Sequence, residues 1–159
     1  MAFVGAAGLA MYSQTPVLGA IGFVSKTIYL EQTSQDYEVV EALNQLLGGE
    51  KSQQRTLVFV RHLYYLKIPY VNGDPGTSFE ADPEHLQSAQ EWKAFFEKNG
   101  IGYVVRAPDY PAIIAQTLME MERDGDLVPF AQEEVQNFQG KRIDQTRTAI
   151  SVIILRVRR

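Results

Sequence analysis

The sequence predicts an α/β fold: a three-layer, Rossmann-like domain with a mostly parallel sheet and a C-terminal antiparallel β-hairpin. A β-branched apolar run at 57–60 indicates a buried leading strand. Two strand-and-helix repeats follow it, which is the order typical of parallel sheets. Near the C-terminus, two strand-like runs separated by a turn indicate the hairpin.

The first predicted helix spans residues 33–47. Thr33 and Asp36 fit a capping box, apolar residues then recur at spacings of three and four, and Gly48 with Gly49 ends the helix. The leading strand is expected at 56–61, and the polar, tyrosine-rich stretch after it is expected to be a loop.

A second helix is predicted to begin with Asp82 as N-cap and Pro83 at the first helical position, where a missing N–H costs little. Its apolar stripe is interpreted as core, and Asn99–Gly100 ends it. Residues 101–107 form a short apolar strand that should be central and covered on both faces. A third helix is expected from Pro108 to Asp124.

The C-terminal region changes pattern. A strand at 127–131 contains Pro129, which favours an edge position or a short strand because proline cannot donate to a ladder. Runs at 135–138 and 149–157, joined by a turn at 139–141, predict antiparallel strands, and the last should run deep into the sheet.

Composition limits the possible classes of protein. A length of 159 residues, 45% hydrophobic and 21% charged, is ordinary for one globular domain. A net charge of −4 argues against a nucleic-acid partner, because such surfaces are usually basic. The absence of cysteine excludes disulfides and thiolate chemistry and leaves the compartment open.

Residues 1–24 are predicted to be a segment apart from the α/β domain at 25–159. They carry no charge, and the first charged residue is Lys26. A secretory signal would need a basic start, and a full membrane span needs about 20 uninterrupted apolar residues. We therefore interpret 1–24 as the end of a membrane helix or an interfacial helix; a buried N-terminal helix is the alternative.

The loop at 62–74 is the first candidate site, because ligands of parallel sheets collect beyond the carboxyl ends of the strands. As structure, the tyrosines would cover the sheet and His62 would be a hydrogen-bonding loop residue. As function, the tyrosines with Lys67 could stack on a sugar ring or lie at a membrane interface. The candidate binding residues are His62, Tyr64, Tyr65, Lys67, Tyr70, Asn72 and Asp74.

Known catalytic motifs are missing from the sequence. Neither a glycine-rich phosphate loop nor a GxSxG nucleophile setting occurs. With two histidines and no cysteine, a zinc site would need carboxylates in support. No catalytic residue, metal or cofactor is therefore predicted.

Several segments together resemble a known family. They are YSQTP at 12–16, SKTIYLEQTSQDYEVVEALNQLL at 25–47, VFVRHLYYLKIPYVNGDP at 58–75, WKAFFEKNGIGYVV at 92–105 and RAPDYP at 106–111. These look like the C-terminal extramembrane domain of multi-pass membrane glycosyltransferases of the protein-O-mannosyltransferase and aminoarabinose-transferase type. Such enzymes use polyprenyl-phosphate-linked sugars, and their catalytic residues lie between earlier membrane helices that this chain lacks.

The resemblance implies a non-catalytic accessory domain on the extracytoplasmic, periplasmic side of the membrane. It would cap the membrane-embedded active site of the same protein or dock the acceptor, in contact with a glycan or lipid-linked sugar. Two other functions stay open: a free-standing small α/β sugar- or nucleotide-binding protein or enzyme using the 62–74 loop, and a protein-interaction module.

Overall fold

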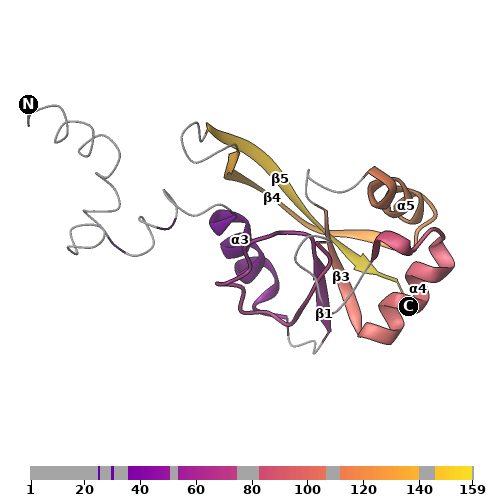
Figure 1. Ribbon diagram of the computed structural model, residues 1–159. Helices are drawn as coiled ribbons and strands as arrows, with labels where there is room; N and C mark the ends of the chain where they lie inside the picture. The colour runs from indigo at the N-terminus through magenta and orange to yellow at the C-terminus, as the bar shows by residue number, and fades with distance from the viewer. Residues whose placement is uncertain are drawn as a thin grey trace, which may run out of the picture.

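The computed structural model describes residues 25, 30, 36–50, 54–74, 83–106, 112–139 and 146–158. These residues form an α/β fold with a mixed, five-stranded sheet (Figure 1). In chain order the elements are α3 (Tyr37–Leu47), β1 (Arg55–Val58), β2 (Tyr70–Asn72), the 3-10 turn η1 (Pro83–His85), α4 (Ala89–Asn99), β3 (Ile101–Arg106), α5 (Ala112–Arg123), β4 (Leu127–Gln139) and β5 (Thr146–Val157).

The strand order is β2-β1-β3-β5-β4. β1 is parallel to both β2 and β3, whereas β5 is antiparallel to both β3 and β4. The predicted C-terminal hairpin is thus confirmed, and its last strand does run inside the sheet. The sheet as a whole is mixed: β5 inserts between β3 and β4, so two of the four strand pairings are parallel and two are antiparallel.

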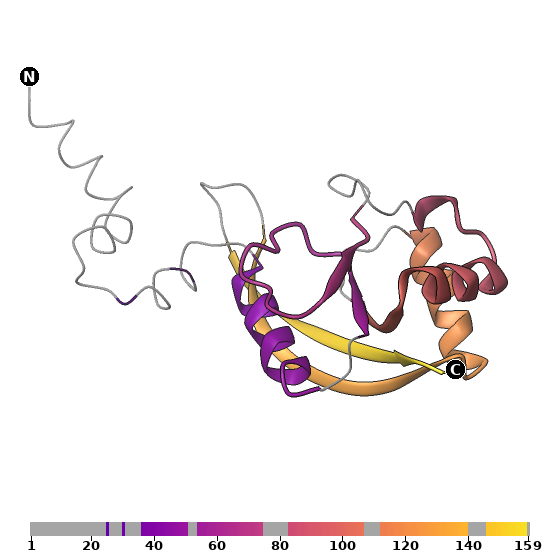
Figure 2. The ribbon, with the colours of Figure 1, turned by 90° about the horizontal axis from the view of Figure 1, so that it is seen from below.

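The core divides into two hydrophobic clusters. One combines the apolar side of α3 with sheet residues that include Val58, Tyr103 and Val152. The other combines α4 and α5 with sheet residues that include Leu57 and Leu155. Because successive side chains of a strand point to opposite faces, neighbouring residues of β1 and β5 enter different clusters. Figure 2 shows α3 well separated from α4 and α5, with the sheet strands between.

β3 confirms the prediction of a central strand. Its first five residues are buried, and Tyr103 and Val104 belong to different clusters. β4 confirms the prediction that the strand containing Pro129 lies at an edge. The two strands predicted at 127–131 and 135–138 are, however, one 13-residue strand. A register shift between Pro129 and Ala131 lets the ladder with β5 continue past the proline.

The second predicted helix begins later than expected. Pro83 opens the short 3-10 turn η1, and α4 begins after Ser88. The Ser88 hydroxyl accepts from the Glu91 backbone N–H, and the Glu91 carboxylate accepts from the Ser88 N–H, which makes a complete capping box. This reciprocal pair outweighs the Asp82–Pro83 signal; Asp82 lies outside the described residues.

The leading strand is shorter than predicted and the loop after it contains a strand. β1 ends at Val58, and Tyr70–Asn72 forms β2 on its outer side. Sequence patterning missed β2 because only Val71 of its three residues is buried. At the first helix, Asp36 is the N-cap of α3, and Thr33 lies outside the described residues.

The predicted apolar segment at 1–24 also lies outside the described residues. Among the helices that the structure does describe, none is long and apolar enough to cross a membrane.

Candidate functional site

The structure places the seven predicted binding residues at separate points rather than in one site. His62 lies near the start of α3, where its Nδ1 is 3.0 Å from Asp36 Oδ2. Asp36 is buried and shares two hydrogen bonds of 3.0 Å with Asn137. The Asp36 N–H donates to the Asn137 side-chain oxygen, and the Asn137 amide donates to the Asp36 carboxylate. His62 therefore fits the alternative of a hydrogen-bonding loop residue.

Tyr65 and Lys67 are held through their backbone by Asn44 of α3. The Asn44 side chain donates to the Tyr65 carbonyl at 3.0 Å and accepts from the Lys67 N–H at 2.8 Å. The Tyr65 ring meets the Tyr37 ring edge to face, with centroids 5.6 Å apart. This segment of the loop is thus fixed against α3.

The tyrosines do not cover the sheet as a group. The Tyr64 side chain projects outward with 89% of its surface exposed, and Tyr65 and Tyr70 are each 37% exposed. In β2, the Tyr70 carbonyl accepts two hydrogen bonds from the Arg55 guanidinium, at 3.1 and 2.9 Å.

Asn72 and Asp74 form the turn that ends β2. The Asn72 side-chain oxygen accepts from the Asp74 N–H at 2.9 Å, and Arg61 Nε lies 3.8 Å from the Asp74 carboxylate. Gly73 between them is buried, and a Cβ there would press against the Phe59 ring at 2.8 Å. Close packing of backbone on the ring thus explains the glycine of this turn.

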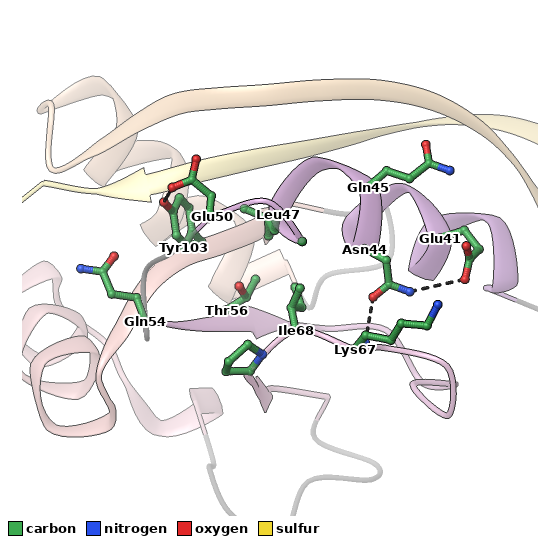
Figure 3. Close-up of a pocket in the computed structure, with 12 residues that line it drawn as sticks. Glu41, Asn44, Gln45, Leu47, Glu50, Gln54, Thr56, Lys67, Ile68 and Tyr103 are labelled. Atoms are coloured by element: carbon green, nitrogen blue, oxygen red, sulfur yellow. Dashed lines mark hydrogen bonds between the residues drawn. The ribbon is translucent and has the colours of Figure 1, made fainter.

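A cavity of about 410 Å³ lies elsewhere, at the amino ends of the parallel strands (Figure 3). Its walls come from the C-terminal half of α3, the connector into β1, the stretch before β2, and β3. The lining residues are Glu41, Asn44, Gln45, Leu47, Gly48, Glu50, Gln54, Thr56, Lys67, Ile68, Pro69 and Tyr103. Of the predicted binding residues, only Lys67 lines it.

The cavity joins polar groups to an apolar floor. Leu47 and Ile68 are buried, whereas Gln45 and Glu50 are exposed at the rim. Amide side chains both donate and accept hydrogen bonds, and carboxylates accept them. A few placed polar groups over apolar surface are typical of small-ligand sites, as is a volume between about 300 and 1,000 Å³.

Tyr103 and Glu50 are paired in the cavity wall. The Tyr103 residue is buried, and its hydroxyl donates to Glu50 Oε2 at 3.2 Å. Burial, followed by the hydrogen bond and the charge of Glu50, raises the pKa of the Tyr103 phenol above its ordinary value. At neutral pH Tyr103 is therefore a hydrogen-bond donor that orients Glu50, not a base.

Sequence reasoning missed these polar residues because it looked for a site only beyond the carboxyl ends of the strands. A signal was present: Glu41, Asn44 and Gln45 have the i, i+3, i+4 spacing that places side chains on one helix face. The apolar residues of the same helix were recognised as core, and the polar stripe beside them was not assigned.

A second cavity, of about 370 Å³, lies between α4 and the end of β5. Lys93 at its edge is paired with Asp126 at 2.7 Å. The walls offer the charged ends of Lys93, Glu97 and Arg158 around apolar side chains. They lack the amide groups of the first cavity, which is therefore the better candidate site.

In the part of the chain that the structure describes, no group of three or more histidine or acidic side chains is placed to hold a metal ion. Comparisons with protein-family models, with curated proteins and with solved structures found no match. The argument for function therefore depends on the site itself and on the sequence.

Proposed function

We propose that this chain is a non-catalytic, carbohydrate-binding α/β domain. In this proposal it is the extracytoplasmic accessory domain of a membrane glycosyltransferase that uses a polyprenyl-phosphate-linked sugar. It would cap the membrane-embedded active site of that protein or dock its acceptor. The sugar contact would be the cavity beside α3.

The observation that carries the binding function is the cavity's combination of groups. The exposed Gln45 amide can both donate to and accept from sugar hydroxyls, and the carboxylates of Glu41 and Glu50 can accept from them. Leu47 and Ile68 offer apolar surface for the C–H face of a ring. Polar side chains at the rim with apolar ones at the floor match the two-sided chemistry of a saccharide.

The accessory role is supported by the sequence segments that resemble membrane glycosyltransferases and by the charge-free stretch at 1–24. As part of the same proposal, we describe the fold as three-layered and Rossmann-like. The division of the core into an α3 cluster and an α4–α5 cluster supports that description.

Binding can be tested by titrating the full chain with neutral mono- and oligosaccharides in isothermal calorimetry. Gln45→Ala removes an exposed rim amide without disturbing the core and should weaken binding by about tenfold, as expected when ~1.4 kcal/mol is lost. Gln116→Ala, at an exposed position of α5, is the matched control. Failure of every saccharide to bind would refute the binding function.

The genomic sequence upstream of Met1 tests the accessory role. We expect the reading frame to continue upstream of Met1 through many hydrophobic spans. A start codon at Met1 with its own ribosome-binding site and no upstream coding sequence would refute the accessory role. Saccharide binding by such a chain would then point to a free-standing binding protein.

A further inference from the structure

We infer that the tip of the loop between β1 and β2, residues 64–67, docks onto an anionic lipid surface. The tip is exposed, aromatic and cationic, and it is held at the end of α3 through which the chain enters the domain. Docking of this kind deepens the proposed accessory role and rests on the membrane association that this role implies. It does not depend on carbohydrate binding.

The tip carries apolar surface that the domain leaves uncovered. In the part of the chain that the structure describes, four large hydrophobic side chains are exposed, and three of them are tyrosines of residues 64–70. Tyr64 is 89% exposed, more than any of the other three, and Tyr65 follows it directly. A tyrosine combines an apolar ring with a polar hydroxyl, and such side chains are enriched where a bilayer meets water.

Core residues hold the tip from both sides. Leu63 before it and Ile68 after it are each 8% exposed and belong to the α3 cluster. Asn44 of α3 bonds the Tyr65 carbonyl at 3.0 Å and the Lys67 N–H at 2.8 Å, and Figure 3 shows its bond to Lys67. The backbone of the tip is therefore set before any partner binds, so docking costs little conformational entropy.

Positive charge accompanies the exposed rings. Residues 51–73 contain four basic residues and no acidic one, although the whole chain has a net charge of −4. The basic residues are Lys51, Arg55, Arg61 and Lys67. Two carboxylates of neighbouring elements offset part of this charge: Asp74 lies 3.8 Å from Arg61, and Glu41 of α3 bonds Asn44 at 3.4 Å. Lys67 is exposed within the tip itself, and a cation beside interfacial tyrosines favours anionic headgroups.

The size of the tip decides between a lipid surface and a protein partner. A stable protein interface takes about 20–30 residues from each side, and the tip consists of residues 64–67 alone. A bilayer interface accepts single projecting rings, each of which adds apolar contact of its own. The tip is therefore large enough to dock on a bilayer and too small to hold a stable protein complex.

The position of the tip in the domain points the same way. The Tyr65 ring meets the ring of Tyr37, the first residue of α3, with centroids 5.6 Å apart. Only residues 25–36 separate α3 from the charge-free stretch at 1–24. A segment of that length spans at most about 40 Å, so a membrane segment at 1–24 would keep the tip within reach of the bilayer.

Docking through the tip would also bring the cavity to the membrane surface. Lys67 belongs both to the tip and to the cavity lining, and Asn44 of the lining bonds its backbone. A glycan that is anchored to the bilayer would then meet the cavity without leaving the membrane surface.

The test places a reporter at the tip of the full chain. Tyr64→Trp introduces an indole whose emission shifts to the blue, and is quenched by brominated lipids, when it enters a bilayer. Met119→Trp is the matched control, because Met119 is also exposed, at 60%, but lies on α5. Trp92 is fully buried and supplies the same background emission to both variants.

We expect a blue shift and bromine quenching for Tyr64→Trp on vesicles of equimolar phosphatidylcholine and phosphatidylglycerol, and neither for Met119→Trp. Adding Lys67→Gln should lower the ratio of docked to undocked reporter about fivefold, the factor that one basic residue contributes at an anionic surface. Lys98→Gln removes the same charge from an exposed position of α4 and should leave the ratio unchanged.

The outcomes separate the docking tip from the accessory role. Quenching at position 64 and not at position 119 supports the tip. Vesicle binding with equal quenching at both positions, or at neither, overturns the tip and leaves the accessory role intact. A chain that binds no vesicles overturns the tip together with the membrane association, whereas saccharide binding is measured separately. A blue shift at position 64 that needs methyl hexosides or high protein concentration, and no lipid, would assign the tip to a sugar or to a second copy and would overturn lipid docking.

Discussion

Asp36 and Asn137 lie 101 positions apart in the sequence and exchange two hydrogen bonds of 3.0 Å. The Asn137 amide donates to the Asp36 carboxylate, and the Asp36 N–H donates to the Asn137 side-chain oxygen. Both residues are 7% exposed. Asp36 has φ 65°, a left-handed conformation that asparagine and aspartate tolerate better than most residues. This pair ties the start of α3 to the edge strand β4.

Replacing Asn137 with alanine should therefore destabilise the whole domain. The variant leaves the buried Asp36 carboxylate without its amide donor, at a cost of about 1–3 kcal/mol in the free energy of unfolding. Chemical denaturation measures the loss. His62→Ala, which removes a half-exposed partner of the same carboxylate, should cost less. Equal costs for the two variants would show that the buried pair has no special role.

Much of the fold is predictable because its signals are local. The apolar stripes of the helices and the buried run of β3 identify core faces without any tertiary information. The strand β2 could not be predicted, since its pairing depends on how 59–69 brings it beside β1. The single long β4 is also a tertiary effect, because its ladder with β5 continues past Pro129.

The candidate site was less predictable than the fold. His62, Asn72 and Asp74 are polar residues after a parallel strand, but their side chains serve local hydrogen bonds. The cavity instead brings together Asn44 of α3, Gln54 before β1 and Tyr103 of β3. Only the packing of α3 on the sheet makes these residues neighbours.

The capping box of α4 predicts an acid-sensitive contribution to stability. The backbone N–H of Gln87, followed by the hydroxyl and N–H of Ser88, lowers the pKa of the Glu91 carboxyl below 4.5. Because the folded pKa is depressed, the contribution is present above pH 4.5 and is lost as pH falls through the lowered value. Ser88→Ala should cost about 1 kcal/mol of unfolding free energy.

The Glu91 carboxyl can be followed directly by NMR pH titration in both proteins. The Ser88→Ala variant should show a Glu91 pKa closer to the ordinary value, because one of its hydrogen-bond partners is gone. An unchanged titration curve would mean that the Ser88 hydroxyl does not contribute.

At Gly100, which ends α4, we expect a substitution to change the stability of the domain through the backbone conformation alone. It has φ 64°, and a Cβ at this position would meet no atom within 4 Å. Gly100→Ala should therefore cost about 1–2 kcal/mol through the left-handed conformation alone. Gly49→Ala is the matched control, since a Cβ there also meets no atom within 4 Å and the φ of Gly49 lies outside the left-handed region. A loss of stability in the Gly49 variant equal to that at Gly100 would contradict this explanation.

The raised pKa of Tyr103 predicts that the domain loses stability at alkaline pH. Burial, and then Glu50, raises the folded pKa of its phenol above 10.0, whereas the unfolded chain titrates near that ordinary value. The stabilising contribution is complete below pH 10 and is lost as pH rises through the folded value. Urea unfolding of wild type and Tyr103→Phe from pH 7 to 11 should show wild type losing stability faster above pH 10; parallel profiles would refute the assignment.

The central claim is that the cavity beside α3 binds a saccharide. The most direct measurement is NMR titration of the ¹⁵N-labelled chain with neutral methyl hexosides, following the side-chain amides of Asn44, Gln45 and Gln54. The account predicts saturable shifts at these three amides and none at Gln116 on α5. Saturable shifts confined to the turn at Asn72, or no saturable shift at all, would contradict it.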